Sequence, residues 1–323
     1  MVLGASGFIG RWVARALCTR GARVHLVVRN KNIGKNILAR SVVEGKMVEA
    51  DLRDAVSTRT LFGNIRPAIT FNLAGYGVDR SERDETTAFE INAQLVKNAC
   101  EAIARVRDIG WPGRDIVHVG SATEYGAIGG NLGENSVCRP TTFYGKSKLA
   151  GTCLLEECCK TLGIKGLTAR LFTVYGPGEH SGRLLPTLID AAYSGTPIPL
   201  TLGNQRRDFT YVQDVADGLL RLGLVSAARP GEIVNLVTGK LTSVKRFARS
   251  GARILRFSKE RLVFGALPTP EEEMEHDEVA LERLYHLIAW VPPTSIEEGI
   301  RKTLDYEAHF GQADSPTVGA SRI

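Results

Sequence analysis

The chain has 323 residues, of which 43% are hydrophobic and 24% are charged, the composition of an ordinary folded protein rather than a disordered or fibrous one. Its 41 basic and 35 acidic residues give a net charge of +6, and because the excess is scattered along the chain we expect no nucleic-acid partner. No apolar run approaches the roughly 20 residues that cross a bilayer, and no leader pattern opens the chain, so we expect a cytoplasmic protein with no membrane partner.

The first thirty residues alternate between strand-like and helical patterns. Residues 1–3 are strand-like, residues 8–21 have helical periodicity, and residues 22–30 form a short run rich in β-branched side chains. The first strand is short, so we expect that the natural start of the chain lies upstream of Met1.

A glycine-rich turn separates the first strand from the first helix. In the stretch VLGASGFIG, Gly4 would make the turn, Gly7 would permit close approach of a phosphate, and Gly10 would let the helix pack on the sheet. Because a helix N-terminus favours negative charge, this turn predicts a site for the pyrophosphate of a dinucleotide. The alternative is a tight turn without a ligand. The other residues of this turn expected at the cofactor are Ser6, Phe8 and Ile9.

The end of the second strand bears on the choice of cofactor. A carboxylate there would hold the ribose 2′-hydroxyl of NAD, but the sequence is VVRN, with Arg29 and no acidic side chain. A guanidinium matches a 2′-phosphate, so we expect NADP(H), with NAD(H) as the alternative. Arg29 could also be a solvated residue, and Arg11 could share its role.

Strand and helix patterns alternate through the first half of the chain. Strand-like runs cover residues 68–75, 115–122 and 165–172, and helical patterns cover residues 86–107 and 144–162. This alternation predicts an α/β fold, a Rossmann-type doubly wound parallel sheet covered on both faces.

The pattern changes near residue 176, where a glycine-rich loop precedes a helical pattern over residues 184–195. We therefore expect an NAD(P)-binding Rossmann domain over residues 1–175. Residues 176–310 would form a smaller α/β substrate-binding part, some segments of which return to the Rossmann domain. Residues 311–323 are small and polar, and we expect a flexible tail there.

The cysteines show no spacing typical of a metal site, and two of them are adjacent in a helical pattern. We expect reduced thiols and no metal. The six are Cys18, Cys100, Cys138, Cys153, Cys158 and Cys159.

Three residues in the middle of the chain predict a catalytic group. Tyr144 and Lys148 are four residues apart, so on a helix both side chains leave the same face. An ammonium nearby favours the ionised phenol, and the pair can exchange a proton with a carbinol or a carbonyl. Ser121 follows a strand end, where ligands bind in doubly wound sheets, and could hold the substrate oxygen. A surface helix pair and a capping serine are the alternatives.

Together these motifs resemble the extended short-chain dehydrogenase/reductase family, which includes nucleotide-sugar epimerases, dehydratases and 4-ketoreductases. The resemblance runs from Val2 to about Tyr306 and implies hydride transfer at a sugar carbon, with Tyr144 as acid or base. The further motifs that carry it are ADLRD (50–54), NLAG (72–75), INAQLVKNA, RLFTVYGPG (170–178), RRDFTYVQDVADGLL (206–220) and AWVPPTSIEEGI (289–300).

The resemblance also implies further cofactor contacts. Asp51 and Leu52 would lie beside the adenine, and the loop that follows the strand in NLAG would lie beneath the cofactor. The remaining residues expected at the cofactor are Leu73, Ala74, Gly75 and Asn92, together with Tyr144 and Lys148 of the triad.

One departure from the family pattern concerns dehydration. The 4,6-dehydratases carry an Asp-Glu pair after the catalytic Ser or Thr, where this sequence has Ala122 and Thr123. Neither side chain is a general acid or base at ordinary pH, and Glu124 lies one place too far along and points elsewhere. We therefore expect that the protein is not a 4,6-dehydratase.

The resemblance implies that Arg207 meets a substrate diphosphate, with an ion pair to Asp208 or Asp214 as the alternative. Two further positions depart from the family: Thr173 replaces a common Asn, and Thr269 stands near where an arginine often grips the second phosphate. The expected substrate-binding residues are Thr123, Thr173, Arg183 and Arg207.

These observations favour a reductase of a nucleotide-linked 4-keto-(6-deoxy) sugar that uses NADP(H). A nucleotide-sugar 4-epimerase that retains NAD is the second hypothesis, since SATEYG also resembles UDP-galactose 4-epimerases. A non-catalytic or redox-sensing NAD(P)-binding protein is the third. By resemblance we expect a homodimer through the helices at 86–107 and 144–162.

Overall fold

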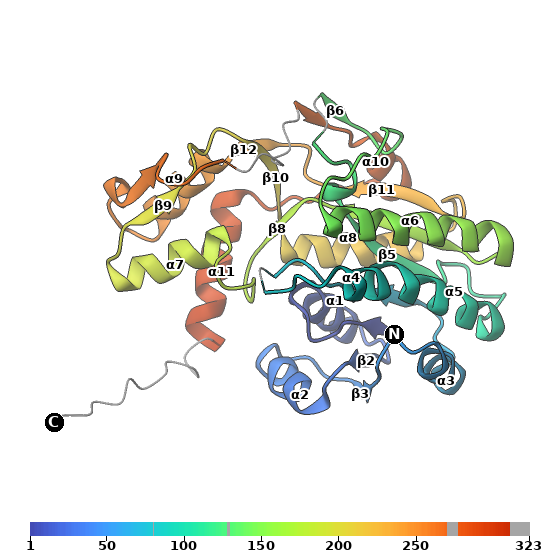
Figure 1. Cartoon of the computed structure of the whole chain (residues 1–323). Helices are drawn as coiled ribbons and strands as arrows, with labels where there is room; N and C mark the ends of the chain where they lie inside the picture. Colours follow the sequence, from blue (N-terminus) through green and yellow to red (C-terminus); the bar gives the residue numbers. More distant parts are fainter. Residues whose placement is uncertain (80, 128–129, 270–276, 311–323) are drawn as a thin grey trace.

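The computed structural model describes residues 1–79, 81–127, 130–269 and 277–310. Its centre is a parallel sheet of seven strands in the order β11-β7-β5-β4-β1-β2-β3, so the Rossmann-type fold predicted from the sequence is confirmed (Figure 1). The expected tail, residues 311–323, lies outside the described residues. The sheet strands are β1 (Val2–Leu3), β2 (His25–Val28), β3 (Lys46–Glu49), β4 (Thr70–Asn72), β5 (Ile116–Ser121), β7 (Gly166–Leu171) and β11 (Glu232–Leu236).

Helices cover both faces of the sheet. The helices α3, α5 and α6 share one buried apolar cluster, and α1, α2 and α8 contribute to the other. Such two-sided cover explains why strands such as β7 are buried along their whole length. The bounds are α1 (Phe8–Thr19), α2 (Lys31–Arg40), α3 (Ala55–Ile65), α5 (Leu95–Val106), α6 (Phe143–Leu162) and α8 (Val212–Leu224).

The helix predicted over residues 86–107 is interrupted. It divides into α4 (Glu85–Phe89), one π-helical turn (Glu90–Gln94) and α5. The backbone oxygen of Asn92 in this turn lies so close to Gly151 of α6 that an added Cβ at Gly151 would stand 2.1 Å from it. Close packing of two helices at a π-turn is typical of functional sites, and hydrophobic periodicity alone does not reveal it.

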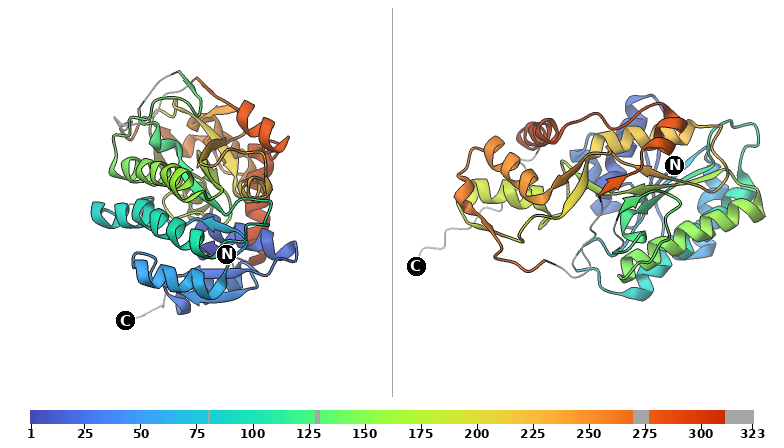
Figure 2. Two further views of the ribbon diagram at one scale, coloured as in Figure 1. Left: turned by 90° about the vertical axis from the view of Figure 1, so that its right-hand side faces the viewer. Right: turned by 90° about the horizontal axis from the view of Figure 1, so that it is seen from above.

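The second part of the molecule lies beyond one end of the large sheet, as the view from above shows (Figure 2). A three-stranded sheet in the order β12-β10-β8 connects this part to the Rossmann domain. Its other elements are two helices, α7 and α9, and the long final helix α11. The bounds are β8 (Thr173–Tyr175), β10 (Arg206–Tyr211), β12 (Leu241–Ser243), α7 (Leu184–Ser194), α9 (Val244–Ile254) and α11 (Ile296–Phe310).

Short elements complete the described chain. Two further parallel pairs, β9 with β13 and β6 with β14, lie outside the two larger sheets, and α10 packs near β11 and α8. Among the described residues, no helix is long and apolar enough to span a membrane. The bounds are β6 (Asn131–Leu132), β9 (Ile198–Leu200), β13 (Leu262–Phe264), β14 (Glu278–Val279), α10 (Glu282–Ile288) and the 3₁₀ turns Ala122–Glu124 and Lys259–Arg261.

An aromatic cluster fixes the position of β8 and β10. The ring of Phe247 stacks on Phe209 with centroids 4.4 Å apart, and it meets Tyr175 edge-on at 5.3 Å. Each aromatic pair of this kind contributes about 0.5–1.5 kcal/mol beyond its buried area. The cluster therefore holds the two strands that carry Thr173 and Arg207.

Candidate active site

The glycine turn between β1 and α1 packs against neighbouring backbone too closely for larger side chains. Gly4 has a φ of +72°, and a Cβ there would stand 2.8 Å from the backbone nitrogen of Ala74. A Cβ on Gly10 would stand 2.1 Å from the carbonyl oxygen of Gly4. The backbone can take this shape only with glycine at both positions, as the turn of a dinucleotide-binding site requires.

The first turn of α1 supplies the electrostatics of the expected phosphate cradle. Gly7 is the N-cap and offers no side chain to the helix, so the first N–H groups of α1 are available to an anion. Phe8 and Ile9, which follow it, also line the cavity that contains Tyr144. The expected phosphate cradle and the expected catalytic group therefore share one crevice.

At the expected adenine end, basic residues surround Asp51. The Asp51 carboxylate accepts hydrogen bonds from Nε and Nη2 of Arg53 at 3.0 and 2.6 Å, and this contact lowers the pKa of Asp51, with a smaller contribution from the charge of Arg29. Arg29 is exposed just after β2, and Leu52 is buried. The sequence did not single out Arg53, although it belongs to the same ADLRD motif.

Asn92 holds the loop that follows β4. Its Oδ1 accepts a hydrogen bond from the Tyr76 N–H at 3.0 Å, and its Nδ2 donates to the Tyr76 carbonyl at 2.8 Å and to Ser147 Oγ at 2.9 Å. These bonds use both N–H groups of the Asn92 amide, so only its oxygen can accept a further hydrogen bond. Within the structure, Asn92 acts by positioning the loop that contains Leu73, Ala74 and Gly75.

Ser121 and Tyr144 meet at the carboxyl end of β5. Ser121 lies at the end of the strand, 9% exposed, and its hydroxyl contacts the Thr123 hydroxyl at 2.8 Å. Tyr144 lies in the first turn of α6, partly exposed to the cavity, and shares a hydrogen bond with Ser121. The two hydroxyl groups are thus placed to hold one substrate oxygen between them.

Lys148 lies one turn further along α6 and is 3% exposed. Its ammonium donates a hydrogen bond to the Val119 carbonyl. Burial lowers the pKa of Lys148 to about 8, against a smaller opposing effect of Glu124. The group is therefore near its titration point in the weakly alkaline range.

The pKa of Tyr144 differs from the sequence expectation. We expected Lys148 to lower it, but in this structure burial raises it to about 12. The Ser121 hydrogen bond and the charge of Arg183 oppose that rise, whereas Glu124 and Glu82 add to it. Tyr144 is consequently a protonated phenol at neutral pH, which suits a proton donor.

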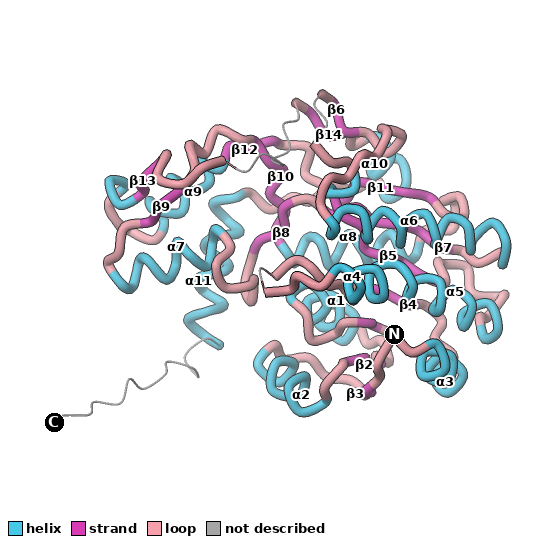
Figure 3. Tube along the Cα trace, in the orientation of Figure 1, coloured by secondary structure: helices cyan, strands magenta, loops and turns pink. Residues whose placement is uncertain are grey.

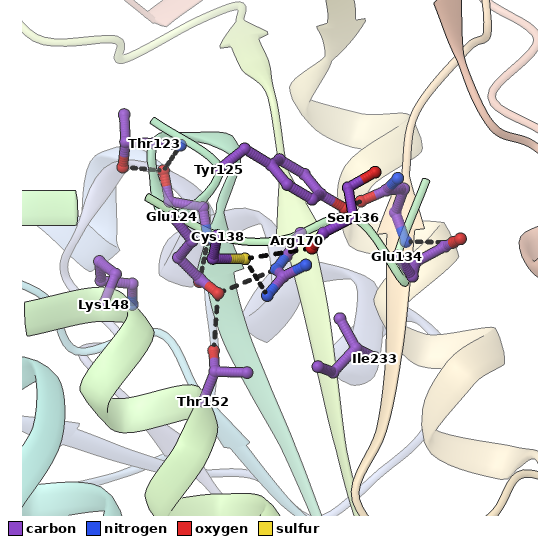
Figure 4. A network of polar contacts seen from close by, with 12 residues as sticks. Thr123, Glu124, Tyr125, Glu134, Ser136, Cys138, Lys148, Thr152, Arg170 and Ile233 are labelled. Atoms are coloured by element: carbon purple, nitrogen blue, oxygen red, sulfur yellow. Dashed lines mark hydrogen bonds and ion pairs between the residues drawn. The ribbon is translucent and has the colours of Figure 1, made fainter. Parts of the chain in front are cut away.

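A buried polar network lies directly behind Ser121. The Glu124 carboxylate accepts hydrogen bonds from the Ser121 N–H at 2.8 Å, from Thr152 Oγ1 at 3.0 Å and from Arg170 Nε at 2.9 Å. Figure 4 shows Glu124 turned toward Arg170 and Thr152. The side chain of Glu124 is 0% exposed and that of Arg170 is 2% exposed, so both charged groups are buried. We expected this segment to be strand-like, whereas Ala122–Glu124 is a 3₁₀ turn, and Glu124 fixes that turn after β5.

The predicted substrate residues gather in one place. A cavity of about 430 Å³ is lined by Ser121, Tyr144 and all four substrate-binding candidates. A second cavity of about 370 Å³ shares with it Thr173, Arg183 and Arg207, and extends to β9 and the aromatic Phe247. The four candidates are Thr123, Thr173, Arg183 and Arg207.

Two cavity residues were not predicted to bind the substrate. Glu179 and His180 belong to the glycine-rich loop between β8 and α7, drawn in pink in Figure 3, and both line the two cavities. The Nδ1 atom of His180 lies 4.0 Å from an Asp79 carboxylate oxygen. The available sequence signal was a carboxylate within the glycine-rich segment YGPGEHSG.

The six cysteines are all free, as expected from their spacing. Among the residues that the structure describes, no group of His, Cys, Asp and Glu is arranged to hold a metal ion.

Comparison with known proteins gives a consistent result. The model of the NAD dependent epimerase/dehydratase family matches residues 1–236. A dTDP-6-deoxy-L-talose 4-dehydrogenase (NAD(P)(+)) from Kitasatospora kifunensis is 26% identical over 93% of this chain and 93% of its own. The crystal structure of UDP-glucuronic acid 4-epimerase from Bacillus cereus, in complex with UDP-glucuronic acid and NAD, is 21% identical and matches the fold with a TM-score of 0.83 over 95% of this chain and 98% of its own.

The expected exclusion of 4,6-dehydratases is wrong. A probable dTDP-glucose 4,6-dehydratase from Sinorhizobium fredii (strain NBRC 101917 / NGR234) is 26% identical over 96% of this chain and 93% of its own length. The exclusion rested on Ala122 and Thr123 and on the position of Glu124, all in one short segment. An acid or base can reach a sugar from any element around the cavity, and Glu179 is a carboxyl group in the cavity wall.

Proposed function

We propose that this chain, which belongs to the NAD dependent epimerase/dehydratase family, uses NADP(H) to reduce a nucleotide-diphosphate-linked 4-keto-(6-deoxy) sugar. The observation that carries this proposal is the shared cavity. Its lining includes Ser121 and Tyr144 as well as Phe8 and Ile9, which follow the glycine turn at the start of α1. A sugar carbon bound there would lie between the proton donor and the cofactor.

A bound nicotinamide would supply the hydride. The protein supplies the proton and the geometry: the Tyr144 hydroxyl donates a proton to the C4 oxygen as the carbonyl becomes an alcohol, and Ser121 holds that oxygen in place. The raised pKa of Tyr144 keeps the phenol protonated in the free enzyme. Lys148 places a positive charge one turn away, which stabilises the phenolate left after proton transfer.

The two cavities suit the two ends of a nucleotide sugar. The sugar would occupy the cavity with Tyr144, and the nucleotide would extend into the cavity between β9 and α9. Arg207 lies in the shared wall, where the diphosphate would pass, and a guanidinium matches phosphate oxygens.

The preference for NADP(H) rests on charge at the ends of β2 and β3. Arg29 is exposed there, Arg53 lies beside it on Asp51, and the end of β2 itself carries no carboxylate. A 2′-phosphate would gain from two guanidinium groups. The relative from Kitasatospora, named as using NAD(P)(+), is compatible with this preference.

A 4-epimerase that retains NAD is the second candidate. The observation that favours it is the likeness in fold to the solved epimerase from Bacillus cereus, which contains NAD. We also propose a homodimer through α4, α5 and α6, and a cytoplasmic location, for which six free thiols are the expected state.

A substrate screen tests the proposal. The purified protein is first denatured, and any released NAD or NADP is identified. UDP-, GDP-, CDP- and dTDP-linked 4-keto-6-deoxy sugars are then offered with NADPH or NADH, and the parent UDP-, GDP-, CDP- and dTDP-hexoses are assayed without added cofactor for 4-epimerisation and 4,6-dehydration.

We expect consumption of NADPH and formation of a 4-hydroxy product. Retained NAD with interconversion of C4 epimers would favour the second candidate, and release of water from a nucleotide hexose would make the protein a dehydratase. Absence of all three activities would contradict the proposed function.

A further inference from the structure

Glu179 has an unusual place in the wall between the two cavities. Its side chain is 5% exposed, and its Oε1 lies 3.6 Å from Arg183 Nε. Its other oxygen, Oε2, is buried and has no hydrogen-bond partner among the described residues. A buried carboxylate oxygen without a partner is costly, and a functional role in catalysis or ligand binding is one reason why proteins retain such a group.

The loop that carries Glu179 is firmly anchored. The Glu179 N–H donates to the Gly176 carbonyl at 3.2 Å, which closes the turn. The indole of Trp12 donates to the Pro177 carbonyl at 3.0 Å, and the Arg11 guanidinium donates to the Gly178 carbonyl at 3.1 Å. Because both donors belong to α1, the cofactor-binding helix fixes the position of the carboxyl group.

The charges around Glu179 place it at the sugar end of the site. The Arg183 charge acts on the Tyr144 phenol and lowers its pKa, so the Glu179–Arg183 pair lies within electrostatic range of the proton donor. Burial raises the pKa of Glu179 to about 7, while Arg183 and the Gly176 backbone oppose that rise. The other titratable and charged groups that line the same cavities are Asp79, Tyr144, Tyr175, His180, Arg183, Arg207 and Asp208.

We propose that Glu179 is a specificity-determining residue, whose Oε2 accepts a hydrogen bond from a hydroxyl group of the sugar while Arg183 holds Oε1. Together the two side chains carry no net charge when Glu179 is ionised, so the pair selects a neutral sugar over a uronic acid. The uronate carboxylate would meet the Glu179 carboxylate across a poorly solvated contact. This inference rests on the proposed binding of a nucleotide sugar.

The test measures ligand binding by calorimetry at pH 8. The ligands are UDP, UDP-glucose and UDP-glucuronic acid, and dTDP and dTDP-glucose are measured in parallel. The variants are Glu179→Gln, which keeps the shape, and Glu179→Ala. The control is Asp190→Asn, which removes a negative charge from the exposed part of α7, the helix that follows the same loop. Thermal melting checks that each variant is folded.

We expect the wild-type protein and Asp190→Asn to bind UDP-glucose at least about tenfold more tightly than UDP-glucuronic acid. Glu179→Gln should bind UDP as the wild type does, lose about tenfold in affinity for UDP-glucose, and bind UDP-glucuronic acid more tightly because Arg183 is left uncompensated. The inference would be overturned if Glu179→Gln bound UDP-glucose as tightly as the wild type does and also bound UDP-glucuronic acid as tightly as the wild type does.

A second measurement separates this inference from the proposed function. In protein labelled with ¹³C at the glutamate carboxyl groups, the resonance missing from Glu179→Gln identifies Glu179. Its titration should shift when UDP-glucose is added and remain where it is with UDP alone. An unchanged titration despite measured binding of UDP-glucose refutes the role of Glu179 but leaves the proposed function intact. If the wild type binds none of the nucleotides or nucleotide sugars, the proposed function fails and the inference fails with it.

Discussion

The cofactor end and the substrate end of this crevice are built in different ways. At the proposed cofactor end, the backbone determines the geometry: Gly4 and Gly10 allow the turn to pack closely on its neighbours, and the first turn of α1 presents its N–H groups. At the substrate end, side chains from β5, α6, β8 and the following loop meet in one cavity. A backbone cradle tolerates almost no added atoms, whereas a side-chain cavity can change its ligand through single substitutions.

The largest expected effect is at the substrate end. Tyr144→Phe removes the proton donor, so kcat should fall about 10²- to 10⁴-fold while the affinity for NADPH stays within about twofold. Turnover and cofactor binding are measured separately, by NADPH absorbance and by fluorescence titration. Tyr193→Phe is the matched control, since Tyr193 is 84% exposed on α7. Undiminished turnover by Tyr144→Phe would remove the catalytic assignment.

The pH dependence of protein stability tests the burial of the Glu179 carboxyl group. Because the pKa of Glu179 is raised to about 7 from 4.5, wild-type stability from this group declines as the pH rises from below 4.5 through 7. Glu179→Gln has no such loss. At pH 8 this variant should therefore be more stable than the wild type by about 2–3 kcal/mol, and at pH 4.5 the two proteins should be about equally stable. Urea unfolding at both pH values gives the difference. A gain that is the same at both pH values would exclude burial of the charge as its cause.

The cofactor end is tested by adding one methyl group. In Gly10→Ala the new Cβ would overlap the Gly4 carbonyl oxygen, so the turn must shift and the affinity for NADP(H) should drop about 100-fold. Fluorescence titration with NADPH measures the change. Gly63→Ala, on α3 where a Cβ meets nothing within 4 Å, should bind the cofactor as the wild type does. Normal affinity in Gly10→Ala would show that the cradle is not the phosphate site.

The charge of Lys148 should make the rate of reduction depend on pH. Its pKa is lowered to about 8 by burial, so its charge is lost above that pH, and kcat/KM for reduction should fall about tenfold per unit beyond pH 8. The Lys148→Met variant should have a lower kcat/KM at every pH, and its kcat/KM should not fall above pH 8. A wild-type profile that stays level to pH 10 would contradict the role of the ammonium.

The smallest effect concerns the choice between the two cofactors. Arg29→Ser should weaken binding of NADPH by about tenfold and leave NADH nearly unchanged, because only NADPH carries the 2′-phosphate. Arg53→Ser should act in the same direction and also free Asp51 from its partner. The ratio of the two dissociation constants is the readout. An equal loss for both cofactors would place these arginines away from the 2′ position.

The difference between the two ends also explains what the sequence could predict. The glycine turn, the Tyr144–Lys148 spacing and Ser121 at a strand end are local patterns, and each fixes its own geometry within a few residues. The contact of Asn92 with Tyr76 and Ser147 joins three separate segments, so only the folded chain reveals it. Glu179 was missed for the same reason, because its orphaned oxygen is a property of its surroundings.

Two errors have physical lessons. The dehydratase exclusion judged chemistry from Ala122, Thr123 and Glu124, although the carboxyl groups around a cavity come from distant elements. The expected fall in the pKa of Tyr144 considered the charge of Lys148 and omitted the cost of burying a phenolate, which is the largest cause of the shift in this structure.

The bonds from Trp12 and Arg11 to the loop after β8 have a consequence for how the enzyme diverges from its relatives. They join residues that are 165 and 167 positions apart in the sequence, and they tie the loop at the rim of the cavity to α1. A loop of different length would have to place two backbone carbonyls where Trp12 and Arg11 can reach them, so changes in the loop are coupled to α1.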